Sequence, residues 1–128
     1  MNATPHVPVS VGELIDKITI LEIKVERLPS QQSRELADLE RRALEQVLGG
    51  LALPDVADLR HALRSINEQL WEVEDALRDC ESRGQFDEEF IRLARSVYRM
   101  NDERARLKAA INEVTGSEIR EQKGYAEY

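Results

Sequence analysis

The chain has 128 residues, of which 25 are acidic and 18 are basic, so its net charge is −7. This length is enough for about one domain with a core that needs no metal ion or disulfide bond for support. The negative charge repels nucleic acid and anionic membranes, and neither is expected as a partner. One cysteine, Cys80, and two histidines cannot form an internal disulfide bond or a cysteine-based zinc site, and we expect no metal ion or cofactor.

The first nine residues contain Pro5 and Pro8, which favour an extended segment. They lack the basic start and apolar run of a secretion signal, and the chain has no uninterrupted apolar stretch of about 18 residues. We therefore expect a cytoplasmic protein. Charged residues make up 34% of the chain and aromatic residues 5%, a composition that favours helices over strands.

The first predicted helix spans residues 11–28. Ser10 lies just before it and Glu13 lies three residues later, a spacing typical of a capping box. One face of this helix is an ordinary core stripe of Val11, Leu14, Ile18, Leu21, Val25 and Leu28. The opposite face mixes isoleucines with charges: Asp16, Ile20, Ile23 and Arg27. We therefore expect the helix to be packed on both sides, against another helix or another subunit.

Three more helices are predicted along the chain. The second covers residues 33–48 and ends at a pair of glycines, and its apolar positions are Leu36, Leu39, Ala43 and Val47. A long third helix spans residues 55–83, where apolar side chains recur in alternating steps of three and four. The segment around Gly84 breaks this pattern, and a fourth helix spans residues 87–115.

Two helices of about 28 residues joined by so short a break must fold back as an antiparallel hairpin, roughly 40 Å long at about 1.5 Å per residue. We expect the two shorter helices to cover the apolar seam of this hairpin. The sequence thus predicts one all-α helical-bundle domain over residues 1–128, with an extended segment at 1–9 and a C-terminal tail at 117–128.

Polar side chains enter the expected seam of the fourth helix, which the fold alone does not explain. Burial of such groups without partners costs about 1–3 kcal/mol each, so they must be paired, solvated or in contact with a ligand. One interpretation is a polar layer that fixes the helix register. The other is a pocket for a carboxylate or phosphate, with the candidate residues Asn67, Trp71, Glu74, Arg95, Tyr98, Asn101, Arg104 and Lys108.

The sequence contains none of the common enzyme signatures. It has no Ser-His-Asp pattern, no glycine-rich phosphate loop and no Glu-x-x-His motif, so we assign no catalytic residue. The first expectation is a non-catalytic binding or scaffolding protein, homodimeric through the first helix or the hairpin, with an anionic small molecule or another protein as its partner. The alternative is a small helical enzyme that acts on an anionic metabolite.

Three stretches, VSVGELIDKITILEIK, LARSVYRMNDERARLKAAIN and GSEIREQKGY, resemble a bacterial family catalogued as domain of unknown function 6165. The resemblance covers nearly the whole chain. It implies no activity and no catalytic residue. Some members are associated with genes for sugar transfer, so the resemblance implies a link to cell-envelope polysaccharide metabolism.

The segment ELIDKITILEIKVER also resembles the first helix of the all-helical chorismate mutases. That resemblance would give Asp16 and Arg27 the roles of pocket residues for a dicarboxylate. The chorismate mutases need another arginine one to two turns earlier, where this chain has Val9, Ser10, Val11 and Gly12.

Overall fold

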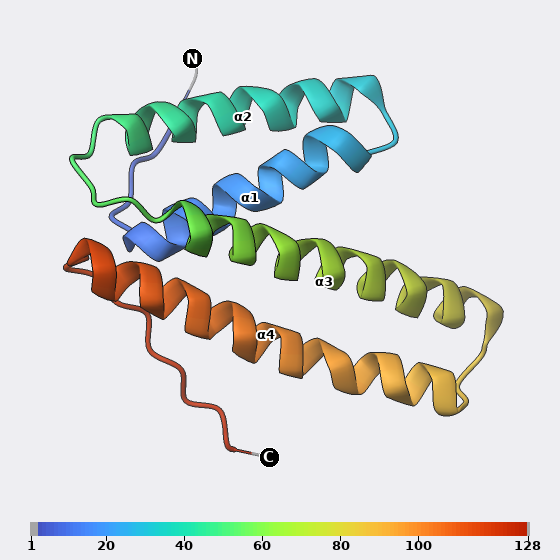
Figure 1. Cartoon of the computed structure of the whole chain (residues 1–128). Helices are drawn as coiled ribbons and strands as arrows, with labels where there is room; N and C mark the ends of the chain where they lie inside the picture. Colours follow the sequence, from blue (N-terminus) through green and yellow to red (C-terminus); the bar gives the residue numbers. More distant parts are fainter. Residues whose placement is uncertain (1–2, 128) are drawn as a thin grey trace.

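The computed structural model describes residues 3–127, and these form four α-helices without a strand. The helices are α1 (Val11–Arg27), α2 (Gln31–Gly49), α3 (Ala57–Arg83) and α4 (Glu88–Thr115) (Figure 1). The all-α prediction is confirmed, and each helix boundary lies within two residues of its predicted position.

Side-chain caps and left-handed glycines set the helix boundaries. The Ser10 hydroxyl accepts a hydrogen bond from the Glu13 amide at 3.0 Å, and Ser30 and Asp87 cap α2 and α4 in the same way. Gly84 and Gly116 end α3 and α4 with φ angles of 65° and 66°, which a residue with a side chain rarely adopts. Glu13 does not complete the predicted capping box, because its carboxylate binds Lys108 instead.

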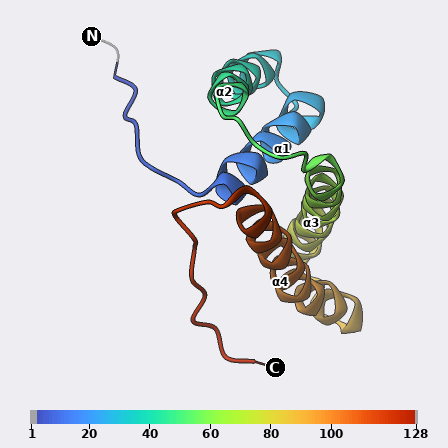
Figure 2. The same ribbon diagram turned by 60° about the vertical axis from the view of Figure 1, so that its left-hand side comes forward.

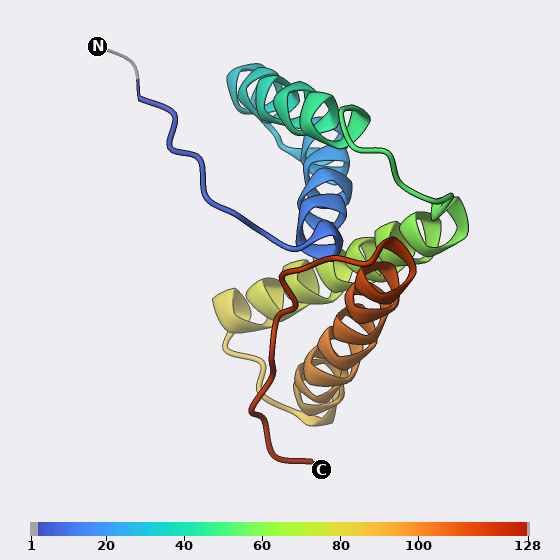
Figure 3. The ribbon, with the colours of Figure 1, turned by 90° about the vertical axis from the view of Figure 1, so that its left-hand side faces the viewer.

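The helices form three layers, with α1 in the middle. The α3–α4 hairpin lies on one side of α1 and α2 lies on the other (Figures 2 and 3). The prediction had both short helices on the hairpin, whereas the backbone contacts of α2 are with α1. The reason is the three-residue link over residues 28–30, which folds α2 directly back onto α1.

The core lies where α1 crosses the hairpin. Ile15, Leu63 and Ile111 are fully buried there, and Ile66 joins them. Ile15 belongs to neither stripe predicted for α1. It is buried because α1 has helices on both sides, so most of its circumference is covered and a two-stripe description of the helix is too narrow.

The C-terminal tail begins with a buried serine. Ser117 accepts a hydrogen bond from the Val11 amide at 3.1 Å, so it satisfies one of the free amides at the start of α1. Further along, Glu121 reaches Lys108 of α4. The tail therefore joins the end of α4 to the start of α1.

No helix among residues 3–127 combines the length and the apolar character that a membrane crossing requires.

Gly12 marks the closest approach of α1 to α4. Its amide donates to Asn112 Oδ1 at 2.7 Å, and a Cβ added at Gly12 would lie 2.5 Å from the backbone oxygen of Lys108. Such a Cβ has no room, because the nearest atom belongs to the backbone of a packed helix. The start of α1 can sit this close to α4 only with glycine at this position.

Gly12→Ala should therefore lower the free energy of unfolding by about 1–3 kcal/mol, the usual cost of overpacking. Gly49→Ala is the matched control, since nothing lies within 4 Å of a Cβ there and alanine favours the helix. Chemical denaturation measures both. Equal stability of the two variants would contradict the close contact at Gly12.

Candidate functional site

A buried polar cluster lies between α1, α3 and α4. Asp16 of α1 is fully buried, and Arg104 of α4 binds both of its oxygens, with Nε–Oδ1 at 2.9 Å and Nη2–Oδ2 at 2.5 Å. Asn67 of α3 donates to Asp16 Oδ1 at 2.9 Å and to Thr19 Oγ1 at 3.0 Å. The bidentate geometry holds the guanidinium in one orientation. One side chain of α1 thus ties together both helices of the hairpin.

A second group of charges lies one turn further along α4. The Lys108 ammonium contacts Glu13 Oε2 at 2.6 Å and Glu121 Oε2 at 2.9 Å. Burial alone would lower the pKa of Lys108, but the hydrogen bonds to the two carboxylates outweigh it and raise the pKa. Lys123 and Lys108 together lower the pKa of Glu121 to about 2.

These polar groups are compensated within the chain. Hydrogen bonding to Asp16 raises the pKa of Arg104 despite its partial burial, so its positive charge is already matched. Among the described residues, every buried side-chain nitrogen and oxygen has a hydrogen-bond partner. The cluster around Asp16 and Lys108 is therefore a closed network that fastens α1 and the tail to the hairpin.

The structure brings together only part of the predicted candidate set. Asn67, Arg104 and Lys108 lie in the closed network, as described above. Asn101 and Glu74 are exposed, and Trp71 is half-buried. Asn101 stays in solvent because α1 turns away from α4 beyond Asp16 and follows α3 instead.

Beyond Asp16, α1 forms ion pairs with α3. Glu22 and Glu26 bind Arg64 at 3.4 and 2.7 Å, and Arg27 binds Glu72 at 3.3 Å. The hydrogen bonds that Arg64 donates to Glu68 and Glu26 raise its pKa. The acidic and basic side chains at this crossing therefore match one another.

The second stripe predicted for α1 faces the hairpin within the same chain. Asp16 and Ile23 are buried there, Ile20 is half-buried, and Arg27 reaches Glu68 and Glu72 of α3. The chorismate-mutase resemblance would place Asp16 and Arg27 beside an open pocket. In the structure both side chains bind residues of α3 or α4 instead.

Participants in this network that were not among the predicted site residues include Gly12, Thr19, Asn112, Ser117 and Glu121. Thr19 lies one turn after Asp16, a spacing that could have pointed to a shared partner. Ser117 and Glu121 belong to an irregular tail, where no periodic pattern indicates what a side chain contacts.

A different kind of site lies on the outer face of α4. Six side chains of this helix border a shallow hollow of about 370 Å³: Glu88, Ile91, Arg92, Arg95, Ser96 and Arg99. Arg92 is held by Glu89 at 2.6 Å. Arg95 and Arg99 are exposed and form no hydrogen bond or ion pair in the described structure. Their charges are thus available to a ligand.

The described residues hold no group of three or more histidine, cysteine, aspartate or glutamate side chains that could bind a metal ion.

Comparison with known proteins identifies the family of the chain. Residues 5–128 match the family described as a family of unknown function, DUF6165. The chain belongs to this family. The match confirms the resemblance found in the sequence, and the description of the family supplies no activity for either polar site. No curated protein and no solved structure matches the chain.

The lowered pKa of Glu121 makes the stability that its contacts with Lys123 and Lys108 provide depend on pH. A carboxyl group whose pKa falls on folding stabilises the fold above its usual value of 4.5, and this contribution is lost as the pH falls toward 2. Glu121→Gln should therefore be less stable than the parent at neutral pH. The two proteins should converge in unfolding free energy as the pH is lowered through this window.

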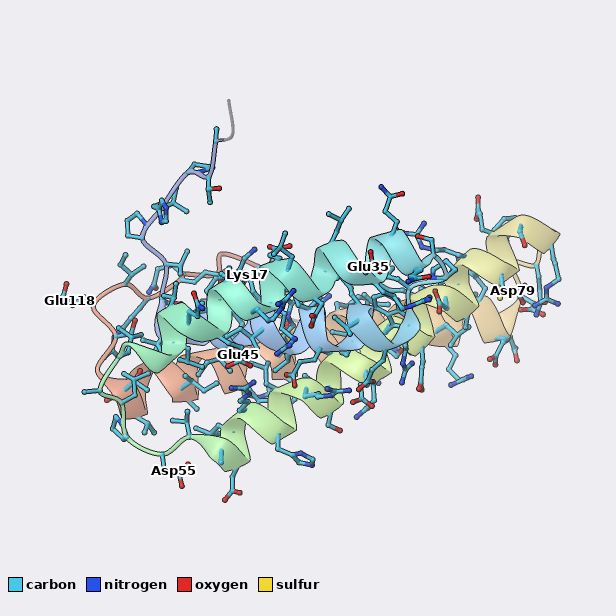
Figure 4. All side chains as sticks on the ribbon, turned by 90° about the horizontal axis from the view of Figure 1, so that it is seen from above. Lys17, Glu35, Glu45, Asp55, Asp79 and Glu118 are labelled. Carbon is cyan, nitrogen blue, oxygen red and sulfur yellow. The ribbon has the colours of Figure 1, made fainter. Side chains whose placement is uncertain are left out.

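Glu118→Gln is the matched control for this measurement. Glu118 is an exposed carboxylate of the same tail and points away from the network (Figure 4). Its variant should follow the parent at every pH. A constant gap between parent and Glu121→Gln from neutral pH to pH 2 would rule out the role given to the contacts of Glu121 with Lys123 and Lys108.

Proposed function

We propose that the protein is a non-catalytic, cytoplasmic binding protein that holds the phosphate or carboxylate group of a small molecule in the hollow on α4. The observation that carries this proposal is the pair Arg95 and Arg99, two exposed guanidinium groups that border one hollow and form no ion pair with a described residue, although Glu88 lies at one end of the hollow. Guanidinium groups bind carboxylates and phosphates through paired hydrogen bonds, so they suit this class of ligand.

The charge distribution supports this choice of site. The whole chain carries 25 acidic and 18 basic residues, whereas α4 carries five acidic and six basic ones. Between residues 90 and 101 the helix has three arginines and no carboxylate. This stretch of α4 is thus locally positive and attracts small anions, whereas the net negative charge of the rest of the protein repels large polyanions.

Arg104 and Lys108 are poorer candidates for the same role. Their charges are bound by Asp16, Glu13 and Glu121, so an external anion would have to displace a carboxylate that already has good geometry. Displacement would leave a buried charge without a partner, which is costly. Of the predicted ligand residues, the proposal therefore keeps Arg95, and it includes Arg99 because this residue borders the same hollow.

The volume of the hollow fits a small ligand. Ligand pockets typically measure about 300–1,000 Å³, and the 370 Å³ of this hollow lies at the low end. The side chains of Ile91 and Ser96 add an apolar contact and a hydroxyl beside the arginines. Because the family resemblance implies a link to polysaccharide metabolism, sugar nucleotides are the first ligands to test.

Binding of inorganic phosphate, citrate and a sugar nucleotide should be measured by isothermal titration calorimetry at low ionic strength. We expect binding that weakens as salt is added, since both arginines are exposed and their charges are screened. The double variant Arg95→Ala/Arg99→Ala should lower the affinity at least tenfold, which corresponds to a loss of about 1.4 kcal/mol of binding free energy.

Arg78→Ala provides the control, because Arg78 is an exposed arginine of α3 that does not border the hollow. Its loss reduces the total positive charge without changing the site. Equal weakening by Arg78→Ala and by the double variant Arg95→Ala/Arg99→Ala would indicate a non-specific charge effect and contradict the proposal. Absence of binding for all three ligands would also contradict it.

A further inference from the structure

The outer face of α2 carries an apolar stripe that no other part of residues 3–127 covers. Leu36 and Leu39 are each 60% exposed and Val47 is 53% exposed, while Ala43 between them is exposed as well. These four residues, called the α2 stripe, are spaced by three or four positions and so lie along one side of the helix. Large apolar side chains grouped in this way on a surface mark a contact site.

The α2 stripe is separate from the face that α2 turns toward α1. Ala37 is the buried residue of α2, and Leu44 and Leu48 are half-buried on its side of the helix. At 100° per residue, Ala37 and Leu48 lie more than a quarter-turn from the centre of the α2 stripe. The sequence alone assigned the α2 stripe to the core of the bundle, whereas the structure exposes it. The helix therefore has two apolar faces, and within the described part of the chain only one of them is packed against another helix.

We propose that the α2 stripe binds the α2 stripe of a second copy of the chain, with the two helices antiparallel. An antiparallel pair related by a two-fold axis near Leu39 brings the two Leu39 side chains together. It also places Leu36 of each copy next to Ala43 of the other, so a large side chain meets a small one. Leu36, Leu39 and Ala43 match themselves in this way, as a two-fold symmetric interface requires, and Val47 lies at the end of the interface, opposite the polar start of α2 in the other copy.

Charges on the rim of the stripe complement each other in the same arrangement. Glu35 and Arg42 lie on the same flank of the stripe, seven residues apart, and an antiparallel two-fold pair sets Glu35 of each copy beside Arg42 of the other. Both side chains are exposed. Their present contacts are weak surface contacts, Glu35 with Gln31 at 3.0 Å and Arg42 with Asp38 at 3.2 Å. Two intermolecular ion pairs can therefore form without breaking a buried contact.

The charge of α2 also favours a second copy over a strongly charged partner. α2 carries three arginines and four carboxylates, so two copies meet there with little of the repulsion expected from a chain of net charge −7. In Figure 4 the outer face of α2 is turned toward the viewer, and α1 and the hairpin lie behind it. Nothing in the described chain stands in front of this helix, so a second copy can approach it.

The arrangement differs from a dimer through helix one. The second stripe of α1 is occupied by the hairpin, since Asp16 and Ile23 are buried within the chain. A second copy at that face would have to displace α3. The α2 stripe, by contrast, is available without any rearrangement.

Sedimentation equilibrium of the full chain over the micromolar range should show a reversible monomer–dimer equilibrium. Leu39→Glu places a carboxylate at the two-fold axis next to its own copy and should reduce the mass to that of the monomer. Val114→Glu is the control, because Val114 is a 48% exposed apolar residue on α4, and this variant should remain dimeric. Circular dichroism of each variant verifies that the helices are intact.

Charge reversal tests the antiparallel geometry. Glu35→Arg and Arg42→Glu should each weaken the dimer, and the double variant should restore it, because each intermolecular pair is then reversed rather than broken. The two Glu40 side chains meet on the opposite flank, so Glu40→Gln should tighten the dimer. A chain that is monomeric at every concentration, or a dimer unaffected by Leu39→Glu, would overturn the proposal. A double variant that dimerises no better than the two single charge reversals would overturn it as well.

Discussion

The contact between Asp16 and Arg104 is the constraint on which the rest of the structure depends. A carboxylate cannot be fully buried unless a positive charge and hydrogen-bond donors surround it, and here Arg104 and Asn67 supply both. Because Asp16 belongs to α1, Asn67 to α3 and Arg104 to α4, the three helices have to meet at one point. The nearby contacts of Gly12 with Asn112 and of Lys108 with Glu13 also join the start of α1 to α4.

Much of the fold could be predicted from local chemistry. The capping residue Ser10, the glycines that end α3 and α4, and the three-and-four spacing of apolar residues fix where helices begin and end, and these signals lie within a few positions of one another. The placement of α2 could not be predicted, because both of its faces carry apolar residues and the pattern does not show which one meets α1. Ile15 was missed for the related reason that α1 is covered on both sides.

The candidate site was predictable in its residue types and less so in its partners. Polar groups in the seam of α4 indicated that Arg104 and Lys108 need partners, and Asn67 was in the same candidate set. Their partners Asp16, Glu13 and Glu121 lie about 90 positions away or in an irregular tail, so no periodicity connects them. Because these charges are compensated internally, the surfaces that we propose for other molecules are the arginines of α4 and the α2 stripe.

A double-mutant cycle on Asp16 and Arg104 tests the central role of this contact most directly. Unfolding free energies of Asp16→Ala, Arg104→Ala and the double variant give the coupling between the two side chains without counting their other contacts. A buried bidentate pair should show a coupling of about 1–3 kcal/mol, in the range of residues that share one network. Additive effects, with a coupling near zero, would contradict the account. The arrangement of the helices would then depend mainly on the apolar core around Ile15.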